Sequence, residues 1–275
     1  MPGEFSAGIV NEETGQTGQA GRDEELATGR GKKLIYLSPR AFHEAVLQDK
    51  SLLFDARNAY ESRAGFFAGA VVPPIRKFGG LPGYLDVAWP TLQTLMRQEG
   101  RSEVLTYCTG GIRCEKGARL VLDRHLTSSP SHTRDGEQGA DEITVATLQG
   151  GICAYLEWVE EEVEAGRMKK SDSIFRGRNY VFDARGSVGL DEEDTCATGC
   201  AGCGTSTARL GKCRGRGCCI VLVLCEGCEV RGTHCCTGCV VISEAVTDER
   251  RRKGVCDCEK ERESRERAGM VLRAA

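Results

Sequence analysis

The chain has 275 residues, of which 28% are charged, and its formal net charge is −3 at pH 7. This length allows one domain with a full core plus a smaller module, and the charge excludes a protein that is basic overall, so any nucleic-acid contact needs a local patch. No apolar run approaches the roughly 20 residues that span a bilayer, and the acidic, Gly-rich start lacks the features of a signal peptide, so we expect a cytoplasmic protein without membrane contact, with an organellar location left open.

The first part of the chain predicts a disordered segment and then a strand–helix–strand unit. Residues 1–30 are rich in Gly, Glu and Thr and show no apolar periodicity, which favours disorder. Leu34–Leu37 is an expected strand, and Ser38-Pro39 is an expected helix start, with serine as N-cap and proline at the first helical position. Leu52–Asp55 is the second expected strand.

The middle of the chain continues this alternation. The Pro- and Gly-rich residues 72–83 predict a loop, and Trp89–Gln98 predicts a helix. A short buried strand is expected over Val104–Tyr107, and apolar residues at helical spacing predict a helix from Glu115 to Leu122. Residues 127–141 have the composition of a surface insertion.

The last alternating unit completes the predicted domain. Thr144–Leu148 is an expected strand, Gly150-Gly151 follows it, and Ala154–Ala165 is an expected amphipathic helix. Strands that alternate with helices predict an α/β domain over residues 31–190, with a parallel sheet covered by helices on both faces. Ligands of such folds lie at the carboxyl ends of the strands, where Asp55, Cys108 and Gly150-Gly151 are all expected.

The loop between the third expected strand and its helix begins with a cysteine and ends with an arginine. Its six residues are Cys108, Thr109, Gly110, Gly111, Ile112 and Arg113. Backbone N–H groups and the positive end of the helix dipole point into such a loop, so they favour the thiolate form of the cysteine. The sequence therefore predicts Cys108 as a nucleophile. Three neighbours have two open roles each: Cys114 either resolves an adduct on Cys108 or only packs, and Asp55 and Arg57 either support the site or pair structurally.

The length of this loop is that of a rhodanese loop, whereas the related phosphatase loop is one residue longer. The strand-end Asp55-x-Arg57 and the Gly69-Ala70 pair also resemble rhodanese landmarks. Residues 107–116, with the sequence YCTGGIRCEK, are similar to the signature of the tRNA uridine hydroxylase family of rhodanese-like proteins. Leu148–Ile152 and the motif between Phe175 and Arg185 match the same family.

This resemblance covers about residues 34–185 and carries expectations about function. It implies oxygen-dependent hydroxylation of a wobble uridine at carbon 5, with tRNA as substrate, Cys108 as catalytic residue and Arg113 neutralising an anionic adduct or substrate. The cysteine-rich tail resembles the eukaryotic branch, of the thiosulfate sulfurtransferase/rhodanese-like domain-containing protein 2 type. Family members carry a small α/β domain ahead of the rhodanese domain, and about thirty residues stand there in this chain.

Thirteen of the sixteen cysteines follow residue 195, and several form CxxC pairs, which in a reducing compartment indicates metal binding. Four thiolates make one tetrahedral zinc site, so residues 191–245 predict a module that holds two structural zinc ions and needs them to fold. Disulfides or an iron–sulfur cluster are the alternatives. No organic cofactor is expected. The predicted ligands are Cys200, Cys203, Cys213 and Cys218 for one ion, and Cys225, Cys228, Cys236 and Cys239 for the other.

Several details of the cysteine-rich region stay open. His234 or Cys235 could replace Cys236, and the two sites could interleave. Cys196, Cys256 and Cys258 are left without a predicted role. Residues 246–275 carry charges of both signs at helix-forming positions and predict an exposed helical or disordered tail without chemistry of its own.

Three functions agree with these features of the sequence. The first is a rhodanese-fold enzyme that modifies tRNA. The second is a sulfurtransferase that takes sulfane sulfur from a small donor as a Cys108 persulfide, stabilised by the loop N–H groups and Arg113. The third is a non-catalytic binding module. Contact with RNA would need basic residues around the loop, and the candidates are Arg76, Lys77, Arg119, Arg124, Lys169, Lys170, Arg176 and Arg178.

Overall fold

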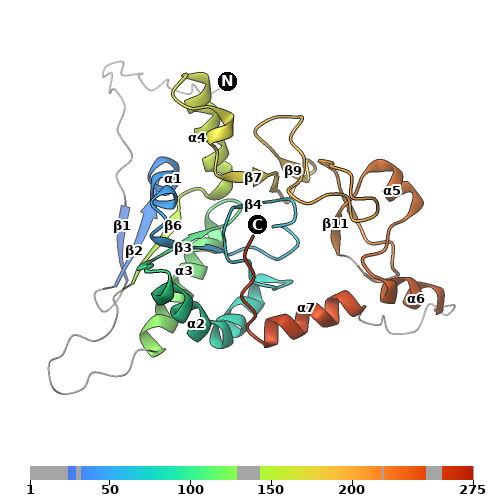
Figure 1. Cartoon of the computed structure of the whole chain (residues 1–275), viewed down its shortest axis with the longest axis horizontal. Helices are drawn as coiled ribbons and strands as arrows, with labels where there is room; N and C mark the ends of the chain where they lie inside the picture. Colours follow the sequence, from blue (N-terminus) through green and yellow to red (C-terminus); the bar gives the residue numbers. More distant parts are fainter. Residues whose placement is uncertain (1–23, 29–31, 129–142, 219, 246–255, 275) are drawn as a thin grey trace, which may run out of the picture.

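The computed structural model describes residues 24–28, 32–128, 143–218, 220–245 and 256–274. Its centre is a five-stranded sheet with the order β1-β2-β6-β5-β3 (Figure 1). Four strands are parallel, and β1 pairs antiparallel with β2 at one edge. The strands are β1 Glu24–Thr28, β2 Lys32–Leu37, β3 Ser51–Asp55, β5 Glu103–Tyr107 and β6 Thr144–Leu148.

Helices cover both faces of this sheet, which confirms the predicted α/β class. On one face, α1 and α4 pack over Leu53, Leu105 and Tyr107; on the other, α2 and α3 pack over Leu52 and Val104. Neighbouring strand residues point to opposite faces, so the apolar strands read from the sequence are buried on both sides. The helices are α1 Pro39–Leu47, α2 Leu81–Gln98, α3 Ile112–Ser128 and α4 Gly151–Glu164.

Three helices differ in extent from the prediction. The expected loop over residues 72–83 ends early, because a short 3-10 turn at Phe78–Gly80 leads into α2 at Leu81 rather than at Trp89. Pro82 lies in the first turn of α2, where an amide N–H has no helical partner to lose. Likewise, α3 is longer than expected at both ends, and α4 begins three residues early, directly at Gly151.

Two further predictions concern segments at the edges of the domain. Disorder was expected over residues 1–30, but Glu24–Thr28 forms the edge strand β1. Most of the expected insertion at residues 127–141 lies outside the described residues, as do residues 1–23. Among the described residues, no helix is both long enough and apolar enough to cross a membrane.

Beyond the main sheet the chain forms small paired elements. β4 pairs antiparallel with β7, β8 with β9, and β10 with β11, and three helices follow in the cysteine-rich region. Their bounds are β4 Gly65–Phe67, the 3-10 turn Lys170–Asp172, β7 Phe175–Gly177, β8 Asn179–Tyr180, β9 Ser187–Val188, β10 Leu210–Lys212, β11 Val221–Val223, α5 Glu226–Arg231, α6 Thr237–Ala245 and α7 Asp257–Arg267.

The C-terminal segment is not a free tail. In Figure 1, α7 runs from the cysteine-rich region back to α2 and the chain then continues toward the sheet. Arg262 of α7 donates to the carbonyl of Pro74 at 2.7 Å, and the backbone N–H of Ala274 donates to the carbonyl of Ala70 at 2.9 Å. The predicted helix is present as α7, and these contacts attach residues 257–274 to the α/β domain.

Candidate active site and cysteine groups

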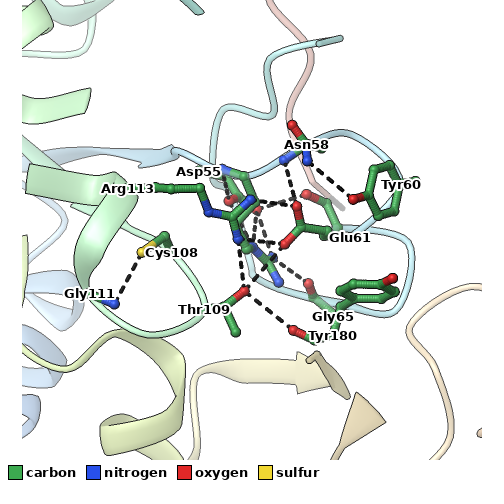
Figure 2. Close-up of polar contacts among 12 residues, drawn as sticks. Asp55, Asn58, Tyr60, Glu61, Gly65, Cys108, Thr109, Gly111, Arg113 and Tyr180 are labelled. Carbon is green, nitrogen blue, oxygen red and sulfur yellow. Dashed lines mark hydrogen bonds and ion pairs between the residues drawn. The ribbon is translucent and has the colours of Figure 1, made fainter. Parts of the chain in front are cut away.

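The predicted nucleophile lies at the carboxyl end of β5, immediately before α3. Cys108 is 1% exposed, and the backbone N–H of Gly111 donates to its sulfur at 3.2 Å (Figure 2). Gly111 has a φ of 87°, in the region that favours glycine, and this conformation turns its N–H toward the sulfur. The loop therefore holds the thiol as the strand–loop–helix reading predicted.

Electrostatics make Cys108 acidic. The pKa of Cys108 is lowered to about 6, mainly by a hydrogen bond from the Cys114 side chain. Hydrogen bonds from the backbone of Cys114 and Arg113 and the charge of Arg113 lower it further, whereas burial raises it. The hydrogen bond with Cys108, together with burial, raises the pKa of Cys114. These shifts make Cys108 the more acidic thiol of the pair and Cys114 the less acidic one. The Cys114 S–H lies 3.1 Å from the carbonyl oxygen of Gly111, to which it donates.

Arg113 is engaged by a buried carboxylate. Its two terminal nitrogens each lie 2.6 Å from an oxygen of Glu61, and it also donates to the Thr109 hydroxyl at 3.0 Å (Figure 2). Glu61 is fully buried, so this bidentate pair neutralises most of the arginine charge inside the protein. Sequence reasoning did not assign a role to Glu61. The available signal was an acidic residue six positions after Asp55, within a loop that follows a strand end.

Asp55 and Arg57 form a second buried pair. The Arg57 guanidinium donates to Asp55 at 2.7 and 2.9 Å and to the carbonyl of Gly65 at 2.7 Å, and Ser62 donates to Asp55 at 2.8 Å. Both charged side chains are completely buried. Asp55 and Arg57 were expected either to support the site or to pair structurally. These contacts agree with the structural role, because the pair fixes the end of β3 and the start of β4.

The first turn of α4 packs against the backbone of the Cys108 loop. The N–H groups of Ile152 and Cys153 donate to the carbonyls of Cys108 and Thr109 at 2.9 and 3.0 Å. Gly151 has a φ of 65°, and a Cβ there would lie 2.6 Å from both the Cys108 oxygen and the Gly111 nitrogen. The Gly150-Gly151 pair is thus a packing requirement of the loop.

The cysteine-rich region brings its thiols together in three groups. Within each group the sulfur atoms all lie within 4.8 Å of one another. The first group is Cys200, Cys203, Cys225 and Cys228; the second is Cys213, Cys218, Cys235 and Cys239; the third is Cys235, Cys236, Cys256 and Cys258. None of the described cysteines is in a disulfide.

The first two groups fit a tetrahedral metal ion. The Cys203 and Cys225 sulfurs are 3.6 Å apart, and those of Cys213 and Cys239 are also 3.6 Å apart. Metal–sulfur bonds of about 2.3 Å give tetrahedral edges of about 3.8 Å, close to these values. Backbone N–H groups further stabilise the sulfurs, as where Cys235 donates to Cys213 at 3.2 Å. These groups can hold metal ions through protein thiolates alone.

The predicted division of the ligands is wrong. Each of the first two groups combines cysteines from two separated stretches, so the sites interleave, as the sequence had left open. Cys235 takes the place predicted for Cys236, and Cys236 belongs to the third group. Cys256 and Cys258, which had no predicted role, join that group as well. His234 is in none of the three.

Comparison with known proteins finds similar rhodanese-like proteins. Residues 176–240 match the family model described as "Rhodanase C-terminal". The tRNA uridine(34) hydroxylase of Chlamydia trachomatis is 30% identical over 76% of this chain and 54% of its own. That of Staphylococcus saprophyticus is 34% identical over 60% of this chain and 42% of its own. The chain is therefore similar to proteins named tRNA uridine(34) hydroxylase, and it carries a match to the rhodanese C-terminal family model.

A plant protein is also similar to this chain. Rhodanese-like domain-containing protein 6 of Arabidopsis thaliana is 33% identical over 72% of this chain and 30% of its own. The chain spans about half the length of the bacterial hydroxylases that it matches.

An aromatic rim, formed by Tyr60, Tyr180 and Phe182, borders the Cys108 loop. The Tyr180 ring lies 5.4 Å from Tyr60 and 5.1 Å from Phe182, and the Arg113 guanidinium lies 5.3 Å from the Phe182 ring. Phe182 is 66% exposed and Ile112, the first residue of α3, is 75% exposed. The rim thus presents apolar and aromatic surface to solvent beside the thiolate.

Several of the predicted basic residues already have partners. Arg119, Arg124 and Lys170 form ion pairs with Glu115, Asp86 and Asp191, and Arg178 donates to the Ser187 hydroxyl and to nearby backbone carbonyls. Arg76, which pairs with Glu259 at 3.6 Å, and Lys77 line a cavity of about 410 Å³ together with Tyr60, Arg63, Glu259 and Arg262. Since Tyr60 belongs both to this cavity and to the aromatic rim, the cavity adjoins the rim beside the Cys108 loop.

Proposed function

We propose that this chain modifies a uridine of tRNA and that Cys108 is its nucleophile. The observation that carries the proposal is the position of Cys108 between β5 and α3, with the Gly111 N–H donating to its sulfur at 3.2 Å. The Cys114 side chain, the nearby backbone N–H groups and Arg113 lower the pKa of this thiol to about 6, and a thiolate beside preorganised donors is the usual form of an activated cysteine. The similarity to tRNA uridine(34) hydroxylases supports uridine of tRNA as the substrate class, and hydroxylation at the wobble position is the finer reaction proposed.

The loop residues have distinct roles in this proposal. Gly110 and Gly111 let the backbone approach the sulfur, and the N–H groups from Gly111 onward stabilise negative charge on Cys108 or its adduct. Arg113 is already paired with Glu61, so it acts chiefly by lowering the Cys108 pKa and by fixing the loop. Asp55 and Arg57 act as positioning residues for the strand end.

The aromatic rim and the basic cavity support an RNA substrate. Stacking of a base on an aromatic side chain is worth about 1–3 kcal/mol, and uridine recognition in single-stranded loops relies on such surfaces. Phe182 is exposed beside Arg113, and Tyr60, whose ring contacts Tyr180, lines the cavity with Arg63, Arg76 and Lys77. We infer that a splayed base contacts Phe182 and Ile112, and that flanking phosphates contact the cavity. A cytoplasmic location is consistent with this substrate.

We also propose zinc as the metal of the first two cysteine groups. Four thiolates at tetrahedral spacing leave no position for substrate, so the ions are structural. They hold together a region whose buried apolar residues are few, chiefly Leu222, Val223 and Leu224, and which needs metal to fold.

Reconstitution with unmodified tRNA tests the proposal. Purified protein, tRNA, oxygen and a thiol reductant, two molecules of which form a disulfide as the second oxygen atom is reduced to water, should give uridine carrying one added oxygen atom, detected by mass spectrometry of the digested tRNA. Cys108→Ser should give none, and Phe182→Ala should raise KM for tRNA by about 5- to 150-fold while leaving the pH at which Cys108 reacts unchanged. Asp183→Asn, a substitution next to Phe182 in the chain, is the matched control. Product formation by Cys108→Ser at the rate of the unsubstituted protein would refute the proposal.

Sulfur transfer is the second candidate, favoured by the size of the loop. The Gly111 N–H lies 3.2 Å from the Cys108 sulfur, so the loop encloses one sulfur atom closely and suits a persulfide. Treatment with thiosulfate should then add one sulfur to Cys108. A persulfide formed in the absence of any tRNA product would favour this reaction over hydroxylation.

A further inference from the structure

We propose that Cys235, Cys236, Cys256 and Cys258 bind a third metal ion of the zinc type, and that the Cys235 thiolate bridges it to the ion of the second group. The two ions would then be held by seven sulfur atoms in all, of which only that of Cys235 is shared. The six that are not shared are Cys213, Cys218 and Cys239 on one side and Cys236, Cys256 and Cys258 on the other.

The position of Cys235 is the evidence for the bridge. Its sulfur lies 3.7 Å from that of Cys218 in the second group, and 3.7 and 3.3 Å from those of Cys256 and Cys258 in the third. Two tetrahedra that share a corner place the shared atom one edge, about 3.8 Å, from the other ligands of both ions. Cys235 has this relation to both groups at once.

The remaining distances of the third group agree with a metal tetrahedron. The Cys235 and Cys236 sulfurs are 3.9 Å apart, and those of Cys256 and Cys258 are 3.3 Å apart. Cys256 is buried and the other three are partly buried. Four thiols from two chain segments meet here with no disulfide among them, and a divalent ion would neutralise the charge of the thiolates at this position.

The third ion would fasten the C-terminal segment to the cysteine-rich module. Cys256 is the N-cap of α7 and Cys258 lies in its first turn, whereas Cys235 and Cys236 directly precede α6. From there α7 leads to the contacts of Arg262 and Ala274 with the rhodanese-like domain. One coordination site would therefore connect the module to the segment that packs against α2 (Figure 1).

Metal counting on the full chain tests this inference. Native mass spectrometry of protein produced with zinc should show three ions per chain. The double variant Cys256→Ser/Cys258→Ser should hold two, and Cys196→Ser, which changes a buried cysteine outside all three groups, should hold three. Two ions in the unsubstituted chain would overturn the proposal, as would a disulfide between Cys256 and Cys258 in freshly purified protein.

A second measurement needs no substitution and tests the bridge itself. In protein loaded with ¹¹³Cd, the ions of the second and third groups should show scalar coupling to each other through the shared sulfur, and the ion of the first group should show none. Three uncoupled signals would overturn the shared thiolate. Neither experiment depends on activity toward tRNA, so its outcome is independent of the proposed reaction.

Discussion

Replacing Cys114 by alanine should make Cys108 less acidic. The Cys114 side chain is the largest contribution that lowers the pKa of Cys108 to about 6, and alanine has no donor. With a pKa of about 6, about nine-tenths of Cys108 is thiolate at pH 7, compared with about 3% for an ordinary thiol of pKa about 8.5. Reactivity of Cys108 should therefore rise as pH increases through about 6 and stay constant above it.

The size of the expected change follows from these fractions. If the loop N–H groups and Arg113 keep part of their effect, the midpoint in Cys114→Ala should move upward by at least one pH unit. The thiolate fraction at pH 6 then falls about five-fold, and the alkylation rate falls with it. Cys114→Ser is the matched control, because its hydroxyl can still donate to the thiolate and should keep the midpoint near 6.

The assay is the pH dependence of alkylation by iodoacetamide, followed on a single peptide. Cleavage after Arg101 and Arg113 releases residues 102–113, in which Cys108 is the only cysteine, so the other fifteen do not interfere. Burial of Cys108 slows the reaction at every pH but leaves the midpoint unchanged. An identical midpoint in Cys114→Ala and the unsubstituted protein would refute the role given to the Cys114 thiol.

Three further predictions concern the support of the loop and the metal. Glu61→Gln leaves Arg113 without its buried partner and should lower the free energy of unfolding by about 3–5 kcal/mol, measured by urea denaturation; a change below 1 kcal/mol would contradict the buried pair. Gly151→Ala places a Cβ 2.6 Å from loop backbone atoms and should lower the melting temperature clearly, whereas Gly83→Ala, with open space around it in α2, should keep or raise it. Removal of metal by a strong chelator should increase hydrogen exchange in the cysteine-rich module and leave the sheet protected; unchanged exchange there would contradict a structural metal.

The fold was largely predictable because its signals are local. Short apolar strands that alternate with amphipathic helices leave few choices other than a parallel sheet with two covered faces. The start of α2 was missed because Pro82 and its glycine neighbours resemble a loop, although proline is compatible with a first helical turn. The strand β1 was missed because its pairing with β2 is a tertiary interaction that polar composition does not reveal.

The site was predictable only where its residues are neighbours in the chain. Cys108 to Arg113 form one loop, so their geometry follows from the strand before them and the helix after them. Glu61 is 52 positions from Arg113, and a single sequence carries no signal for such a pair. The cysteine groups could be predicted only in part for the same reason. The CxxC pairs can be identified in the sequence, but which pairs bind the same ion depends on the tertiary structure.

The most direct test of the central claim is whether Cys108 is needed for uridine modification in cells. A strain that lacks wobble-uridine hydroxylation should regain 5-hydroxylated uridine in its tRNA when it expresses this chain, measured by mass spectrometry of tRNA nucleosides. Expression of Cys108→Ser at the same protein level should restore none. Equal restoration by both proteins would contradict the claim that the loop thiolate performs the reaction.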